Sequence, residues 1–125
     1  MSNVMKVNWF EIPVTDMDRA IAFYEQVFDI KINPMNFGDV AMGWFPPSEE
    51  AGAATGSLIK HETYTPQDNG VLLYFNSNDI HTELNRVVAA GGTVYTEKTI
   101  ISEEHGYMGV FIDSEGNRIA LHSRS

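Results

Sequence analysis

The chain has 125 residues, of which 43% are hydrophobic, and these values are typical of a single globular domain with a substantial core. A net charge of −9 argues against nucleic-acid binding, and the absence of cysteine excludes disulfides, thiolate metal sites and cysteine nucleophiles. The sequence has no apolar run long enough for a membrane span and no signal-peptide pattern at its start, so we expect a cytoplasmic protein.

The first half of the chain predicts a strand, a helix and three further strands. Residues 7–14 alternate between two kinds of side chain, which indicates a strand with two different faces. Asp16 is a suitable N-cap for a helix that ends at Phe28, and the helix has an apolar stripe. Further strands are predicted at residues 30–32, 40–45 and 57–62, with a turn at Asn33–Pro34 and a loop over residues 46–56.

The second half repeats this order. A strand at residues 71–77 precedes a helix capped by Asp79 and ended by Gly91–Gly92. Strands follow at residues 93–96, 107–112 and 118–122, with a hairpin turn at 113–117. The halves match at an offset of 63 residues, the separation of Asp16 and Asp79. We therefore predict an α+β fold of two tandem βαβββ modules, at about residues 5–63 and 69–123 of one domain, with an open cleft on the faces away from the helices.

Two motifs support a family resemblance. The helix sequence VTDMDRAIAFY covers residues 14–24, and the hairpin sequence FIDSEGN covers residues 111–117. Together with the helix start at 78–80 and the Ala-Gly-Gly at 90–92, they resemble the vicinal oxygen chelate superfamily. This superfamily groups glyoxalase I, bleomycin-resistance proteins and extradiol dioxygenases. The resemblance implies paired βαβββ modules around an open cleft, usually in a homodimer, and in metal-using members four inward histidines and glutamates that hold a divalent ion.

The resemblance also places the metal ligands. The first lies seven residues before the helix-capping aspartate, which is Trp9 in the first module and Leu72 in the second. The last lies four residues after the hairpin glycine, at Ala120. None of these side chains can bind a metal, and the fourth-strand position falls on Lys60 or His61. We therefore expect no metal ligands at the usual positions and no cofactor, as in metal-less glyoxalase-related proteins.

Three other side chains lie two residues beyond the lost ligand positions, namely Glu11, Tyr74 and His122. Two residues along a strand keep the same face, so all three are expected to point into the cleft, one layer deeper. Two interpretations remain open. Glu11 and His122 with His61 could form a relocated metal site of two histidines and one carboxylate. Alternatively, Glu11 is hydrogen-bonded to Tyr74 or His122. The predicted substrate-binding residues are Trp9, Glu11, His61, Leu72, Tyr74, Ala120 and His122.

The first functional hypothesis is a binding module for a small, partly apolar molecule, as in bleomycin-resistance-type proteins that sequester a ligand without metal. Trp9, Leu72 and Tyr74 would contact its apolar part, while Glu11 and His122 would anchor its polar groups. The acidic chain favours a neutral or cationic ligand over an anionic one.

The second hypothesis is a lyase or isomerase related to glyoxalase I, with Glu11 as the general base. His122 or Tyr74 would then stabilise the developing enolate. Glutathione conjugates are anionic, and the candidate basic residues form no cluster in the sequence, which argues against this hypothesis; they are Lys60, Lys98, Arg118 and Arg124. A third hypothesis is a regulatory or structural dimer whose cleft is vestigial.

Overall fold

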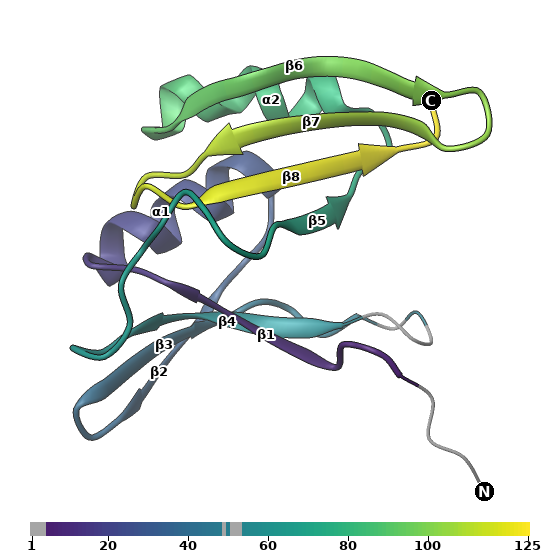
Figure 1. The fold of residues 1–125 in the computed structure, drawn as a ribbon. Helices are drawn as coiled ribbons and strands as arrows, with labels where there is room; N and C mark the ends of the chain where they lie inside the picture. The colour runs from purple at the N-terminus through teal and green to yellow at the C-terminus, as the bar shows by residue number, and fades with distance from the viewer. Residues whose placement is uncertain (1–4, 49, 51–53) are drawn as a thin grey trace, which may run out of the picture.

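The computed structural model describes residues 5–48, 50 and 54–125, and it confirms two βαβββ modules (Figure 1). The first module contains β1 (Trp9–Pro13), α1 (Met17–Phe28), β2 (Asn33–Phe37), β3 (Val40–Trp44) and β4 (Thr55–Lys60). The second contains β5 (Leu73–Asn76), α2 (Ile80–Ala90), β6 (Thr93–Ser102), β7 (Gly106–Ile112) and β8 (Arg118–Ser123). Within the described part of the chain, neither helix is long and apolar enough to cross a membrane.

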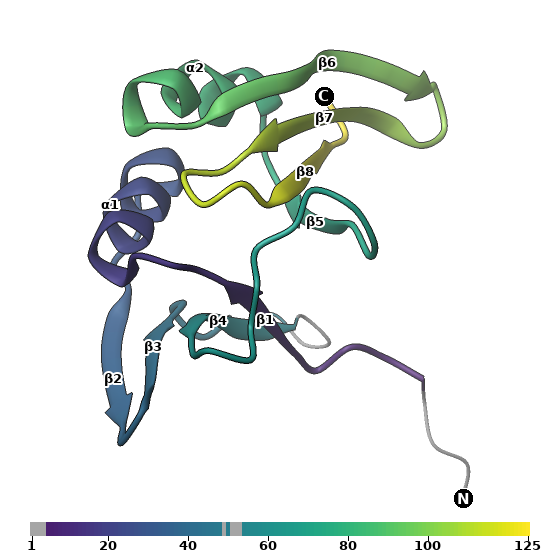
Figure 2. The ribbon, with the colours of Figure 1, turned by 60° about the vertical axis from the view of Figure 1, so that its left-hand side comes forward.

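Each module forms one four-stranded sheet, and the two sheets have the same strand order. The first sheet runs β1-β4-β3-β2 and the second runs β5-β8-β7-β6. The β1–β4 and β5–β8 pairs are parallel, and the other pairs are antiparallel. Both views place β1 and β5 at the neighbouring edges of the two sheets (Figures 1 and 2). The internal repeat seen in the sequence is therefore a repeat of topology.

The two modules share one apolar core, because their helices contact each other and the helix-facing sides of both sheets. Phe23 of α1 packs against Phe111 of β7, with 5.9 Å between ring centroids. Phe10 of β1 meets Phe75 of β5 at 5.5 Å. These aromatic contacts across the module boundary help to stabilise the arrangement of the two sheets.

Both predicted helix starts are confirmed by their caps. The Asp16 side chain accepts a hydrogen bond from the Arg19 backbone N–H at 3.1 Å, and Asp79 accepts one from the His81 backbone N–H at 3.1 Å. Each cap satisfies a backbone donor that has no partner inside its own helix. Gly91 ends α2 in the left-handed conformation with φ at 109°, as the sequence predicted.

The repeated Met-Gly pair of β3 and β7 has a packing reason. A Cβ atom on Gly43 would lie 2.9 Å from Ile32 Cγ2, and one on Gly109 would lie 2.9 Å from Ile80 Cγ2. Both distances are too short for a carbon–carbon contact. Glycine at these two equivalent positions therefore allows apolar side chains to pack directly on the strand backbone.

No strand forms at residues 30–32, and several other predicted strands were wrong in their limits. The strand expected at residues 30–32 begins at Asn33 instead, and Pro34, expected in a turn, lies inside β2. Proline is tolerated there because β2 is the edge strand of its sheet. The fourth strand starts at Thr55 rather than at residue 57. β6 continues to Ser102 because its pairing with β7 extends that far. Parts of the predicted loop at 46–56, residues 49 and 51–53, lie outside the described residues.

Candidate functional site

The first candidate surface is the open face of the first sheet, meaning the face turned away from the helices. Alternation along β1 places Trp9 and Glu11 on this face, opposite Thr55 and Ser57 of β4. Trp44 of β3 also lies opposite Ser57. The Trp9 and Trp44 rings meet edge to face, with centroids 5.4 Å apart, and each residue keeps 36% of its surface exposed. The face therefore presents two accessible indole rings beside a carboxylate.

Ser57 lies on the same face, between Glu11 on β1 and Trp44 on β3. It is fully buried, and its hydroxyl has no hydrogen-bond partner among the described residues. A buried polar group without a partner is unusual and costs stability. Sequence reasoning missed this residue. The pairing of Ser57 with Glu11 would have identified it, but the predicted strand limits did not include the pairing register.

The partner of Glu11 differs from the prediction. The sequence predicted Tyr74 or His122 as the hydrogen-bond partner of Glu11. In the structure the Glu11 carboxylate interacts with the Tyr64 phenol, and the negative charge of Glu11 raises the pKa of Tyr64 above the usual value. The reason is the path of the linker after β4. A turn closed by the Tyr64 N–H and the His61 carbonyl carries Tyr64 back to β1. That path cannot be read from strand alternation.

Glu11 also lines a cavity of about 290 Å³ between the two modules. Arg118, at the start of β8, lines the same cavity, and residues 65–71 of the linker contribute part of its wall. The Arg118 guanidinium lies over the Tyr95 ring, 4.4 Å from its centroid, and its Nε has no hydrogen-bond partner in the described part of the chain. Residues of both modules therefore line this cavity, and in the described part of the chain no Lys, Arg or His nitrogen lies within 4.0 Å of the Glu11 carboxylate.

The second candidate surface is the corresponding open face of the second sheet. Tyr74 lies opposite Ala120, and Asn76 lies opposite His122. Tyr74 is 50% exposed, whereas Ala120 is fully buried. His122 Nε2 lies 2.6 Å from the His105 carbonyl oxygen, so this nitrogen carries a proton and donates it. Tyr74, Ala120 and His122 therefore lie on one face of the second sheet, whereas Glu11 lies on the first sheet. Leu72 precedes β5 and is half-buried.

His61 lies apart from both groups. Strand pairing places Thr55 opposite Trp9 and Ser57 opposite Glu11, so neither Lys60 nor His61 lies opposite these two residues. Lys60 ends β4 and His61 follows it. The His61 ring contacts Thr63 Oγ1 at 2.8 Å and Asp39 Oδ2 at 3.3 Å, beside a separate cavity of about 590 Å³.

These positions do not fit a relocated metal site of Glu11, His61 and His122, because each of the three side chains has a different local partner. Among residues 5–48, 50 and 54–125, no three His, Asp or Glu side chains come together in a group that could hold a metal ion.

A family model supplies the identification. The model of the Glyoxalase/Bleomycin resistance protein/Dioxygenase superfamily matches residues 6–121, nearly the whole chain. The chain belongs to this superfamily. A Glyoxylase-like domain-containing protein from Didymella fabae is 26% identical over 125 residues, which cover 95% of this chain and 94% of the relative.

Solved structures of the superfamily have the same fold. A hypothetical protein from S. aureus is 23% identical, with a TM-score of 0.71 over 97% of this chain and 95% of its own. TnmS3, an antibiotic binding protein from Streptomyces sp. CB03234, is 22% identical, with a TM-score of 0.68 over 100% of both chains. Glyoxalase I from Zea mays is 16% identical, with a TM-score of 0.72 over 93% of this chain but only 45% of the Zea mays chain.

Proposed function

We propose that this superfamily member binds a small, partly apolar organic molecule on its open faces, without a metal ion. The observation that carries the proposal is the Trp9–Trp44 pair. Trp9 occupies a position where the resemblance places a metal ligand, and its ring packs against Trp44 rather than leaving space for an ion. Two exposed indole rings on one sheet face are suited to stack against a flat or apolar ligand.

The charges on the first open face favour a neutral or cationic ligand. Glu11 is exposed and paired with a phenol rather than a cation, so it can accept a donor or an ammonium group from a ligand. The net charge of −9 acts in the same direction at longer range. The fold similarity to TnmS3, which is described as an antibiotic binding protein, agrees with a binding role.

We also propose that the protein is a cytoplasmic homodimer in which a second copy covers part of the open faces. Phe37 and Tyr74 are about half exposed on these faces, and the two tryptophans are accessible beside them. Exposed apolar surface of this kind marks binding surfaces in soluble proteins. A stable homodimer needs about 800 Å² of buried surface per chain, which an open sheet face can supply.

A second candidate function is a lyase or isomerase, and the cavity shared by Glu11 and Arg118 favours it. Glu11 would remove a proton from a carbon next to a carbonyl group, and the Arg118 guanidinium would stabilise the negative charge that develops on the oxygen. Turnover of the hemithioacetal of methylglyoxal and glutathione, lost in Glu11→Gln, would favour this enzyme over the binding module.

The binding proposal is tested by isothermal titration calorimetry of EDTA-dialysed protein. We expect saturable binding of proflavine, a planar aromatic cation, and much weaker binding of 2-naphthoate, a planar aromatic anion. Glu11→Gln should weaken proflavine binding about tenfold, because it removes one charge-assisted contact. Glu103→Gln, an equal charge change in an exposed turn, is the matched control.

Equal affinities for the cation and the anion, or an unchanged Glu11→Gln variant, would contradict the proposal. No binding of any probe, with no turnover, would support the vestigial-cleft hypothesis.

A further inference from the structure

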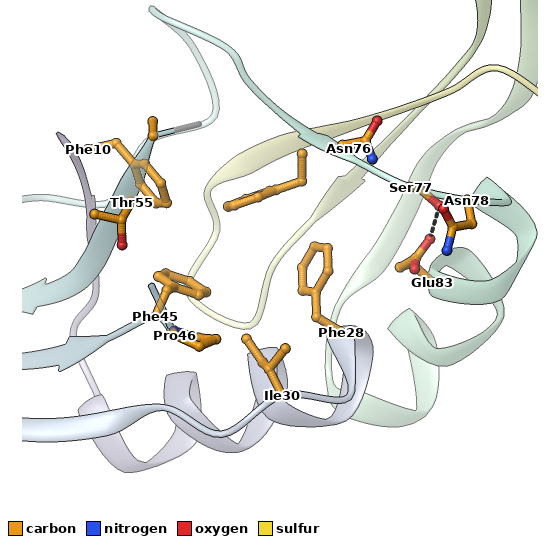
Figure 3. A pocket seen from close by; sticks show the side chains of 12 residues that line it. Phe10, Phe28, Ile30, Phe45, Pro46, Thr55, Asn76, Ser77, Asn78 and Glu83 are labelled. Carbon is orange, nitrogen blue, oxygen red and sulfur yellow. Dashed lines mark hydrogen bonds between the residues drawn. The ribbon is translucent and has the colours of Figure 1, made fainter. Parts of the chain in front are cut away.

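A separate pocket lies at the junction of the two modules, where the end of α1 meets β5 and the start of α2 (Figure 3). Its volume is about 340 Å³, within the range of small-molecule sites. We call it the junction pocket and define it by Phe10, Phe28, Phe45, Phe75, Ser77 and Glu83. Phe10 and Phe45 belong to the helix-facing side of the first sheet, opposite to Trp9 and Glu11. The junction pocket is therefore distinct from the site proposed above.

One end of the junction pocket is aromatic. Phe75 lies at the centre of the group, with ring centroids 5.5 Å from Phe10, 5.1 Å from Phe28 and 5.9 Å from Phe45. Three of these residues, Phe10, Phe28 and Phe75, are only partly buried. Their ring surface is available to an apolar group, and the ring faces are also attractive to a cation.

The other end is polar and carries one charge. Glu83, in the first turn of α2, is the only charged side chain among the described residues that line the pocket. Ser77 donates its hydroxyl hydrogen to Glu83 Oε1 at 2.5 Å, and this contact fixes the carboxylate at the pocket wall (Figure 3). In the described part of the chain, no Lys, Arg or His lies within 4.0 Å of Glu83.

A carboxylate with one hydroxyl donor retains free acceptor positions. The start of a helix also stabilises its negative charge. We propose that the junction pocket is a second binding site, which takes primary amines that carry an aromatic or branched apolar group. The apolar group packs against the phenylalanine rings. The ammonium group donates hydrogen bonds to Glu83 and gains from the adjacent ring faces.

The test uses two probes of nearly equal size and opposite charge, 2-phenylethylamine and 3-phenylpropionate, near neutral pH. Isothermal titration calorimetry should show saturable binding of the amine and no comparable binding of the acid. Glu83→Gln keeps the shape of the side chain and an acceptor for Ser77, and should weaken amine binding about tenfold. Glu103→Gln should leave amine binding unchanged. Glu83→Gln should still bind proflavine with wild-type affinity, which separates this pocket from the open-face site.

Three outcomes would overturn the proposal. The wild-type protein could fail to bind the amine, it could bind the acid equally well, or Glu83→Gln could retain full affinity. The comparison of the two probes uses only the wild-type protein, so it remains decisive even if Glu83→Gln does not fold. Phe28→Leu is a second variant, which removes one ring from the aromatic end. It should weaken binding of 2-phenylethylamine and should not allow 3-phenylpropionate to bind.

Discussion

At the scale of single residues, the hairpin at 113–117 joins the two modules through Glu115. Glu115 Oε1 accepts hydrogen bonds from the backbone N–H groups of Thr15 and Asp16, each at 2.9 Å, just before α1. The Arg19 side chain donates to both carboxylate oxygens, at 2.7 and 2.9 Å. The glutamate of the FIDSEGN motif therefore binds the helix of the VTDMDRAIAFY motif. The two sequence motifs that carry the family resemblance are in direct contact.

The same hairpin holds a second carboxylate, Asp113, whose pKa shifts in the opposite direction to that of Glu115. Burial raises the pKa of Asp113 above its usual value, although Tyr24 and Asn117 donate hydrogen bonds to it. Burial also acts to raise the pKa of Glu115, but Arg19 and the backbone N–H groups outweigh it and lower that pKa from 4.5 to about 2. The difference follows from charge, because Glu115 has a cationic partner and Asp113 has only neutral donors.

Glu115→Gln should lower the free energy of unfolding by about 1–2 kcal/mol near neutral pH, a value reduced because Arg19 is half exposed. The folded state favours the Glu115 carboxylate, so its stabilising effect is fully present above the unfolded pKa of 4.5 and disappears as the pH falls toward 2. Urea unfolding of both proteins across this range measures the effect. A difference that grows on acidification, or no difference near neutral pH, would contradict this role.

At the scale of elements, local sequence patterns predicted what depends on local chemistry. Both helix caps, the repeat and the hairpin follow from residue type and spacing, and each was found as predicted. The limits of β2 and β6 could not be predicted in this way. Pro34 indicates a turn unless the strand is known to be an edge, and residues 97–102, which mix polar side chains with two isoleucines, are strand because β7 pairs with this segment.

In the candidate site, too, the features that depend on local sequence could be predicted, and those that depend on distant segments could not. Alternation along one strand places Trp9 and Glu11 on one face of the first sheet, and Tyr74 and His122 on one face of the second. The contacts of Glu11 with Tyr64 and its shared cavity with Arg118 depend on the path of the linker, which no strand pattern encodes. The junction pocket was not predicted at all, because its phenylalanines come from β1, α1, β5 and the segment after β3, and each one alone is typical of a core residue.

At the scale of the whole molecule, the open faces leave aromatic surface exposed in a single chain, and we expect a second copy to cover part of it. Light scattering after size-exclusion chromatography should give twice the chain mass of 14.0 kDa at micromolar concentration. A mass of one chain under these conditions would contradict the homodimer. In that case the exposed rings would have to be covered by the ligand alone.

We propose that the open face binds organic molecules at the place where metal-using relatives hold an ion. The two tryptophans of the chain, Trp9 and Trp44, both lie on this face, so their fluorescence reports events there. The most direct measurement is a proflavine titration of EDTA-dialysed protein followed by tryptophan fluorescence, repeated with added Zn²⁺ or Ni²⁺. We predict saturable quenching without metal and the same affinity with it. Quenching that appears only after a metal is added would contradict the claim.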